Sequence, residues 1–257
     1  MTYNRLFEPG RIGGLELKNR IVMPAMGCSL AESTGEAGAR IIAYYAARAK
    51  GGAGLIITEI TRVDDETGVG TPNQLSVTNT HVIPQLYRLA EAVHAYDTKL
   101  FVQLHHPGNQ TPSRLIGGKQ PVSASNVTCR VIGEEPRALT TEEVEAMVKK
   151  FVTGAVIAQK AGVDGVEIHA AHGYLVRQVH VEPVDAAVVD LAELVVETAS
   201  QVHAHGVGVH LDELAQRVGE HDGACHHALV RQERVVLAHV HAQVVDDFGR
   251  FLEYIFF

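Results

Sequence analysis

Two histidines and a tyrosine follow one short apolar strand at close spacing, and together they could carry out acid–base chemistry. The strand is predicted at residues 163–168, and His169, His172 and Tyr174 come directly after it. Side chains alternate along a strand, so Glu167 and His169 share one face while their apolar neighbours share the other. Imidazole and phenol groups at one strand end could hold a carbonyl oxygen and deliver a proton. These three residues are therefore the candidate catalytic group.

The elements that must position this group alternate between buried strands and amphipathic helices. The strands are predicted at residues 20–24, 55–58, 100–104 and 163–168, with a hairpin turn before the first of them at Gly13–Gly14. The helices are predicted at residues 38–50, from Thr80 onward, and from a capping box at Thr140–Glu143 onward. Because buried strands alternate with helices, the sequence indicates βαβ units and a parallel sheet.

The position of the polar residues indicates which kind of parallel sheet this is. No Gly-x-Gly-x-x-Gly motif follows a strand, which argues against a dinucleotide-binding doubly wound sheet. The polar candidates lie just after predicted strand ends, where an α/β barrel builds its active site. They are Gly27, Cys28, Glu59, Gln103, His105, His106 and the His169 group. The predicted fold class is α/β, a (β/α)8 TIM barrel that is incomplete, with four βα units recognisable.

Several of these residues also have a structural interpretation. A lone histidine behind a strand is more often a buried core residue, but three such groups at one strand end favour a functional site. His105 and His106 fit a substrate loop and a solvated loop equally well. Glu59 and Glu167 are expected to fill the interior through hydrogen bonds, and Cys28 is expected to be a small packed thiol. The Gly/Pro-rich loop at 107–139 is too long for a simple connection and is predicted to be functional.

Composition limits the class of protein. The 257 residues include 22 Lys+Arg and 30 Asp+Glu, and the net charge of −8 argues against a nucleic-acid partner. No apolar run reaches the roughly 18 residues of a membrane span, and the N-terminus lacks the apolar region of a signal peptide. Three scattered cysteines predict a reducing, cytoplasmic location. The sequence is compatible with an oligomer.

Four stretches together carry a family resemblance. They are NRIVMPAM at 19–26, GLIITE at 54–59, QLHH at 103–106 and VEIHAAHGYL at 166–175. In this order they resemble the Old Yellow Enzyme family of FMN-dependent NAD(P)H:flavin oxidoreductases, which includes enoate and 2,4-dienoyl-CoA reductases. The resemblance runs from about residue 3 to residue 175. It implies FMN as cofactor, NADH or NADPH as reductant, and a small-molecule enone or enoyl compound as substrate.

The resemblance also implies roles for individual residues. The end of the first strand, with Ala25, Met26 and Gly27, would lie against the flavin ring. The side-chain amide of Gln103 would hydrogen-bond to the pyrimidine edge of that ring. His169 and His172 would bind the substrate carbonyl oxygen, where fixed donors stabilise developing charge, and Tyr174 would donate the proton. Relatives often carry a hydroxyl or thiol residue at the position of Gly27. Two alternatives stay open: an inactive, flavin-free barrel fragment, and a non-flavin barrel lyase or isomerase.

The composition changes after residue 175. Residues 176–257 contain no Lys and no Asn but nine of the 15 His, and their 5 Lys+Arg against 13 Asp+Glu account for the whole net charge. We therefore divide the chain into the N-terminal half of an FMN-binding barrel (1–175) and an atypical Val/His/Asp-rich segment (176–257). A frameshifted, non-native segment and a lineage-specific helical replacement are the two explanations. No metal site is predicted, because the histidines lack an i,i+4 pair with a nearby Glu.

Overall fold

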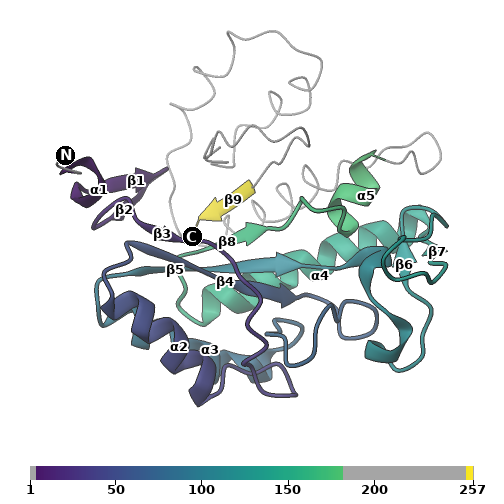
Figure 1. Ribbon diagram of the computed structural model, residues 1–257, viewed down its shortest axis with the longest axis horizontal. Helices are drawn as coiled ribbons and strands as arrows, with labels where there is room; N and C mark the ends of the chain where they lie inside the picture. Colours follow the sequence, from purple (N-terminus) through teal and green to yellow (C-terminus); the bar gives the residue numbers. More distant parts are fainter. Residues whose placement is uncertain (1–3, 182–252, 257) are drawn as a thin grey trace, which may run out of the picture.

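A five-stranded sheet forms the centre of the structure, a computed structural model that describes residues 4–181 and 253–256 (Figure 1). The strands lie in the order β3, β4, β5, β8 and β9, and the first four run parallel. Their bounds are Val22–Met23, Leu55–Arg62, Lys99–His105, Gly165–Ile168 and Glu253–Phe256. The four parallel strands confirm the predicted sheet, whereas β9 pairs antiparallel with β8.

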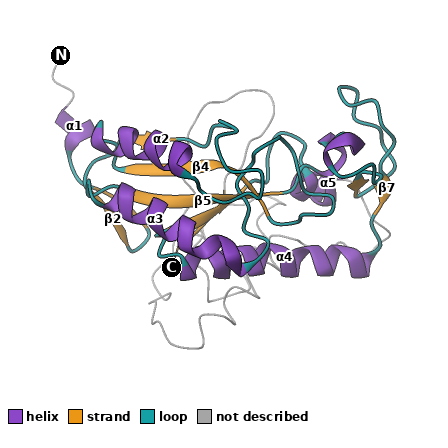
Figure 2. Ribbon diagram, turned by 90° about the horizontal axis from the view of Figure 1, so that it is seen from below, coloured by secondary structure: helices purple, strands orange, loops and turns teal. Residues whose placement is uncertain are grey.

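Three helices follow the parallel strands and cover one face of the sheet (Figure 2). They are α2 (Ala39–Lys50), α3 (Ile83–His94), which the 3-10 turn η1 (Thr80–Val82) precedes, and α4 (Thr141–Lys160). The predicted capping box is present at the start of α4. The side chain of Thr140 accepts a hydrogen bond from the backbone N–H of Glu143, and the Glu143 carboxylate accepts one from the backbone N–H of Thr140.

Alternation along the strands gives the sheet two different faces. On the helix-covered face, apolar strand side chains pack with the helices into the main core, among them Ile56, Leu100, Val102, Val166 and Ile168. Burial of a side chain of this size contributes about 2 kcal/mol, so this face anchors the helices firmly. The intervening residues of the same strands point to the opposite face, which we call the inner face.

A β-hairpin packs on the inner face beside the amino-terminal ends of the strands. Its strands β1 (Gly10–Ile12) and β2 (Leu15–Leu17) pair antiparallel and follow the short helix α1 (Asn4–Phe7). Gly13 in the turn has a φ of +54°, a value that glycine adopts readily, and the predicted turn is confirmed. A second apolar cluster joins the hairpin to the sheet and consists of Ile12, Leu17, Leu55, Ile57 and Phe101. Polar residues of the inner face lie beyond this cluster, toward the carboxyl-terminal strand ends.

Strand β4 is longer than the sequence predicts, and this corrects the expected place of Glu59. The pairing of β4 with β5 shifts register between Ile57 and Ile60, so Glu59 lies at an irregularity inside the strand instead of after it. Its buried carboxylate accepts hydrogen bonds from the backbone N–H groups of Cys28, Ser29 and Leu75 at 2.7, 2.9 and 3.2 Å. The expectation that Glu59 fills the interior through hydrogen bonds is confirmed.

The long connection after β5 has short elements of its own. They are η2 (Gly108–Gln110), η3 (Ser113–Leu115), β6 (Val122–Ser123) and β7 (Arg137–Ala138), the last two forming a parallel pair. The helix α5 (Leu175–Val181) contacts both η2 and β6. The loop is therefore packed against the segment that carries the candidate catalytic group.

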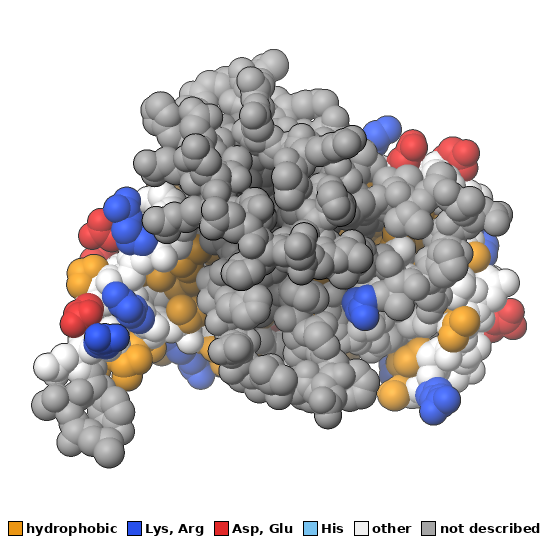
Figure 3. All heavy atoms as spheres, turned by 90° about the horizontal axis from the view of Figure 1, so that it is seen from above, with side chains coloured by type: hydrophobic (Ala, Val, Ile, Leu, Met, Phe, Trp, Pro, Cys, Tyr) orange, Lys and Arg blue, Asp and Glu red, His pale blue; other side chains and the backbone are white. Residues whose placement is uncertain are grey.

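Almost all of the segment 176–257, which the sequence marks as atypical, lies outside the described residues. The histidines from His203 onward also lie outside them. No helix among the described residues is long and apolar enough to cross a membrane. On the side of the molecule away from the helices, described basic and acidic side chains lie interspersed around the periphery (Figure 3).

The hairpin contact leads to a stability prediction. We expect Leu17→Ala to lower the free energy of unfolding by about 3 kcal/mol, because Leu17 is buried against the inner face and its truncation leaves a cavity. Urea denaturation measures the change. The matched control is Leu6→Ala, a 45% exposed leucine, which should change stability by no more than about 0.5 kcal/mol. Equal effects of the two substitutions would contradict the packing role of the hairpin.

Candidate active site

The three predicted catalytic residues come together at the carboxyl-terminal end of β8, and a fourth ring joins them. The ring centroid of His169 lies 5.0 Å from that of His172 and 4.8 Å from that of Tyr174. His105, at the end of β5, lies 4.4 Å from the Tyr174 ring in an edge-to-face contact. We call these four residues the ring cluster. Their assembly follows from the parallel pairing of β5 and β8, which brings both strand ends to one edge.

Hydrogen bonds determine which nitrogens of the cluster can donate. The backbone N–H of Ala171 donates to Nδ1 of His169 at 3.3 Å, so the proton of this neutral imidazole resides on Nε2. That Nε2–H lies 3.1 Å from Nδ1 of His172 and donates to it. Because Nδ1 of His172 accepts this hydrogen bond, the ring N–H of His172 is at Nε2 and can donate to another acceptor. A substrate oxygen placed between the two rings would compete for the hydrogen that His169 now donates to His172.

Burial keeps His105, His169 and Tyr174 of the cluster uncharged. Desolvation, together with the neighbouring His172, lowers the pKa of His169 to about 4. Desolvation also lowers the pKa of His105 well below its ordinary value and raises the pKa of Tyr174. At neutral pH the buried imidazoles are therefore neutral and the phenol keeps its proton, the forms needed for hydrogen-bond and proton donation.

The two histidines that the sequence left undecided are both buried, so a solvated loop is the wrong alternative for them. His105 and His106 are 0% and 1% exposed. His105 is missing from the predicted catalytic group because sequence spacing cannot show that β5 ends beside β8. Its Nδ1 lies 3.4 Å from Nε2 of Gln74, while its Nε2 has no hydrogen-bond partner among the described residues.

His106 belongs to a separate buried polar network. Its Nδ1 accepts a hydrogen bond from the backbone N–H of Gly108, and its Nε2 lies 3.5 Å from the Asp64 carboxylate. Asp64 also accepts a 2.6 Å hydrogen bond from Lys150 of α4. Burial opposes ionisation of Asp64, but its hydrogen bonds from His106, Lys150 and Thr67 hold its pKa well below the ordinary value. This network fixes the end of β5 to α4.

Two glutamines, which no sequence signal singled out, hold the long loop against the candidate site. Gln110 donates from Nε2 to the backbone carbonyls of His172 and Gly173 at 2.7 and 2.8 Å. Gln178 of α5 donates to the Gly173 carbonyl and to Asn109, and its Oε1 accepts from the hydroxyl of Ser123 in β6. His172 has a φ of +55°, and these bonds to its own and the next carbonyl stabilise that conformation.

The predicted cofactor residues lie on or beside the inner face. Ala25 packs against the hairpin cluster, Met26 is 46% exposed, and a Cβ added to Gly27 would meet no atom within 4 Å. Gln103 of β5 is buried and donates from Nε2 to Oε1 of Glu167 at 3.0 Å. Met26 and Gly27 thus border open space, Ala25 is half-buried, and Gln103 lies deeper in the sheet. Their cofactor roles stay predictions.

Glu167 differs from the other buried acids. Burial raises its pKa to about 7, and the hydrogen bond from Gln103 only partly opposes this. Its Oε2 has no hydrogen-bond partner among the described residues. A buried carboxyl oxygen without a partner is costly, so this atom marks a place that can take a further hydrogen bond.

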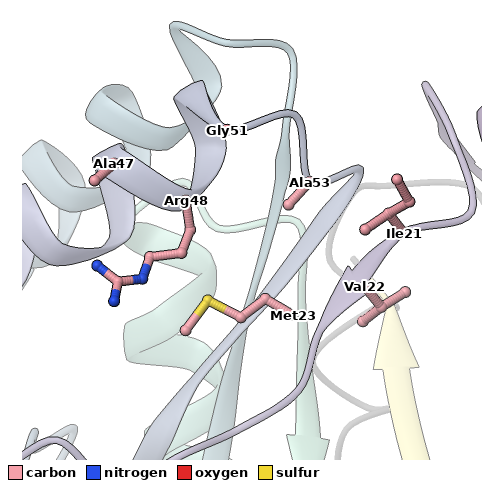
Figure 4. Close-up of a pocket in the computed structure, with 7 residues that line it drawn as sticks. All are labelled: Ile21, Val22, Met23, Ala47, Arg48, Gly51 and Ala53. Carbon is pink, nitrogen blue, oxygen red and sulfur yellow. The ribbon is translucent and has the colours of Figure 1, made fainter.

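A pocket among the described residues lies away from the ring cluster, and no group of metal ligands is found in this part of the chain. No three His, Cys, Asp or Glu side chains of this part of the chain are grouped to share a metal ion. A pocket of about 410 Å³ lies between β3 and the end of α2 and includes Val22, Met23 and Arg48 in its lining (Figure 4). Val22 pairs with the first residue of β4, so this pocket lies at the strand ends opposite the ring cluster.

The chain matches one family model and many known proteins. The model is described as the NADH:flavin oxidoreductase / NADH oxidase family and matches residues 5–184, slightly past the end of the sequence motifs. The chain is 47% identical over 176 residues to an NADH oxidase of Thermoanaerobacter brockii and 40% identical over 182 residues to a cinnamate reductase of Clostridium sporogenes. Each match covers 68% of this chain and 27% of the relative, so the chain spans about a quarter of the length of these relatives.

Solved structures show the same architecture. The chain is similar to morphinone reductase, with a TM-score of 0.68 and 26% identity over 77% of this chain and 59% of that chain. It is also similar to the Old Yellow Enzyme homologue from Zymomonas mobilis, with a TM-score of 0.66 and 32% identity over 76% of this chain and 59% of that chain. These neighbours are TIM barrels, and the predicted fold class is confirmed, the described strands forming part of the barrel.

The raised pKa of Glu167 predicts a pH-dependent stability. The carboxyl ionises near pH 4.5 in the unfolded chain but near pH 7 in the folded protein, so the folded protein keeps this proton up to a higher pH. The contribution of Glu167 to stability should therefore fall by about 3 kcal/mol as the pH rises from 4.5 to 7. Because the lowered pKa of His169 has the opposite effect on stability over part of this range, the test compares each variant with wild type at each pH. In urea denaturation, the stability of Glu167→Gln relative to wild type should rise by about 3 kcal/mol between pH 4.5 and 7. The control, Glu135→Gln at an exposed site, should show no such rise, and a difference between Glu167→Gln and wild type that does not change with pH would contradict the assignment.

Proposed function

Because the chain belongs to the NADH:flavin oxidoreductase / NADH oxidase family, we propose that it is an FMN-dependent oxidoreductase of the ene-reductase type. In this proposal hydride passes from NADH or NADPH through the flavin to the activated C=C bond of a small enone or enoyl compound. The observation that carries the proposal is the ring cluster at the strand ends, where the ring centroids of His169, His172 and Tyr174 lie 4.8 to 6.2 Å from one another.

The polar part of the inner face fits a flavin ring. Oε1 of Gln103 accepts no hydrogen bond from the described residues, and Oε2 of Glu167 is buried without a partner there. Gly27 has open space at the position where a side chain would stand. Ala25, Met26 and Gly27 would lie against the ring and Gln103 would bind its pyrimidine edge. When bound, FMN supplies the hydride transfer that side chains cannot perform.

The ring cluster supplies the other half of the chemistry. The Nε2–H of His172, and that of His169 once it turns from its neighbour, would donate to the carbonyl oxygen of the substrate and stabilise the negative charge that develops there. Tyr174 would donate its hydroxyl proton to the α-carbon of the former double bond. His105 packs edge-on against Tyr174 and restricts the position of that ring.

The proposal extends to the location and the domain division of the chain. We place the protein in the cytoplasm, since its three cysteines are scattered along the sequence. Residues 1–175 form the barrel part in this proposal, and residues 176–257 are an atypical segment that a frameshift would explain. Resequencing the gene tests the second point. An intact parent reading frame beyond codon 175 would support it, and an uninterrupted frame as given would contradict it.

The function is tested by colour and by transient kinetics. Purified full-length chain mixed with FMN and desalted should retain the absorbance of oxidised flavin, bleach on addition of NADH or NADPH, and recover its colour with 2-cyclohexenone. In Tyr174→Phe, bleaching should keep its wild-type rate, while the recovery with the enone should slow by roughly a hundredfold or more because the proton donor is lost.

The matched control is Tyr96→Phe, which removes the hydroxyl of a tyrosine that is 40% exposed and lies outside the ring cluster. Both half-reactions of this variant should match wild type. A chain that retains no flavin would overturn the proposal and favour the inactive barrel fragment or the non-flavin lyase or isomerase. Unchanged recovery in Tyr174→Phe would overturn the role of the tyrosine alone.

A further inference from the structure

Gln103 and Glu167 form a buried pair whose geometry goes beyond filling the interior. They are direct partners in the register of β5 and β8, and both belong to the inner face. The two side chains are 5% and 1% exposed and share one hydrogen bond, from Nε2 of Gln103 to Oε1 of Glu167 at 3.0 Å. Two residues further along β5 and β8, on the same face, lie His105 and His169 of the ring cluster. The pair therefore lies two residues before the ring cluster along both strands.

This hydrogen bond determines the orientation of the Gln103 amide. Oε1 of Glu167 accepts this hydrogen bond, so the amide nitrogen of Gln103, which is the donor, lies on the side of Glu167. The amide oxygen must then point away from Glu167. No described residue donates a hydrogen bond to that oxygen, so it is free to accept one from a ligand. Apart from Glu167, no described residue hydrogen-bonds to the Gln103 side chain in a way that would distinguish its nitrogen from its oxygen.

A comparison with Glu59 shows that Glu167 is not simply a structural plug. Glu59 is equally buried, and its two carboxylate oxygens accept three backbone hydrogen bonds. Glu167 instead has one partner, and its second oxygen is left unpaired in the interior. Buried carboxyl groups that serve only the fold are expected to be satisfied by the protein itself. The unpaired oxygen indicates that the pair is completed by something that binds beside it.

We propose that Glu167 is a positioning residue of the cofactor site, which orients the amide of Gln103 so that its oxygen accepts a hydrogen bond from the ring N–H of FMN. This inference rests on the proposed function, because it requires flavin on the inner face. Glu167 acts through Gln103 and takes no part in proton transfer to the substrate. Its effect should therefore appear in the recognition of the N–H group of the ring.

Flavin binding with and without that N–H group tests the inference. FMN and 3-methyl-FMN, in which a methyl group replaces the N–H hydrogen, are titrated into the full-length chain and followed by flavin fluorescence. Wild type should bind FMN about tenfold more tightly, since the methyl group removes one buried hydrogen bond. Glu167→Leu should bind FMN about tenfold more weakly and lose the preference between the two flavins. Glu167→Gln, whose amide oxygen can still accept from Gln103, should recover most of the preference.

Val166→Ala is the control for a general loss of structure, because Val166 is fully buried on the opposite face of the same strand. It should keep the wild-type preference even if its stability falls. A preference in Glu167→Leu equal to that of wild type would overturn the inference and leave the proposed function intact. A wild type that binds FMN without preference over 3-methyl-FMN would do the same. A wild type that binds neither flavin would overturn the proposed function and the inference together.

Discussion

The parallel pairing of β5 with β8 is the constraint on which the rest of the site depends. Gln103 pairs with Glu167, and the next residues, Leu104 and Ile168, pair with each other. Polar and apolar side chains therefore alternate in step across both strands, the apolar ones facing the helices and the polar ones facing inward. A shift of one residue would bury the polar groups among the helices and expose the apolar ones, so the burial of the main core holds this register.

Burial controls the chemistry of the groups that this register brings together. Desolvation favours the neutral form of every titratable group, and it lowers the pKa of His169 while it raises those of Tyr174 and Glu167. A solvent-exposed imidazole would titrate near neutral pH, but the buried one remains an uncharged donor. The hydrogen bond from His169 to His172 then gives the pair a defined direction, which an exposed pair would not keep.

Surrounding polar contacts hold the site in place without taking part in it. Glu59 fixes the segment after β3, the Asp64 network fixes the end of β5, and Gln178 fixes the loop after β8. Each of these side chains finds its partners within the described protein. Glu167 and His105 are different, because each retains one buried polar atom without a partner, and both lie on the inner face. Completed networks therefore support the structure, and the incomplete ones mark where a ligand is to be expected.

The sequence by itself determined the parallel strands, the capping box at Thr140 and the grouping of His169, His172 and Tyr174, because these depend on short-range periodicity and spacing. It could not determine that His105 lies against Tyr174 or that Glu59 lies inside a strand. Those contacts join residues far apart in the chain, and only the register between strands brings them together. Which buried groups stay charged, neutral or unpaired was decided by the tertiary structure, since desolvation depends on neighbours that the linear sequence does not show.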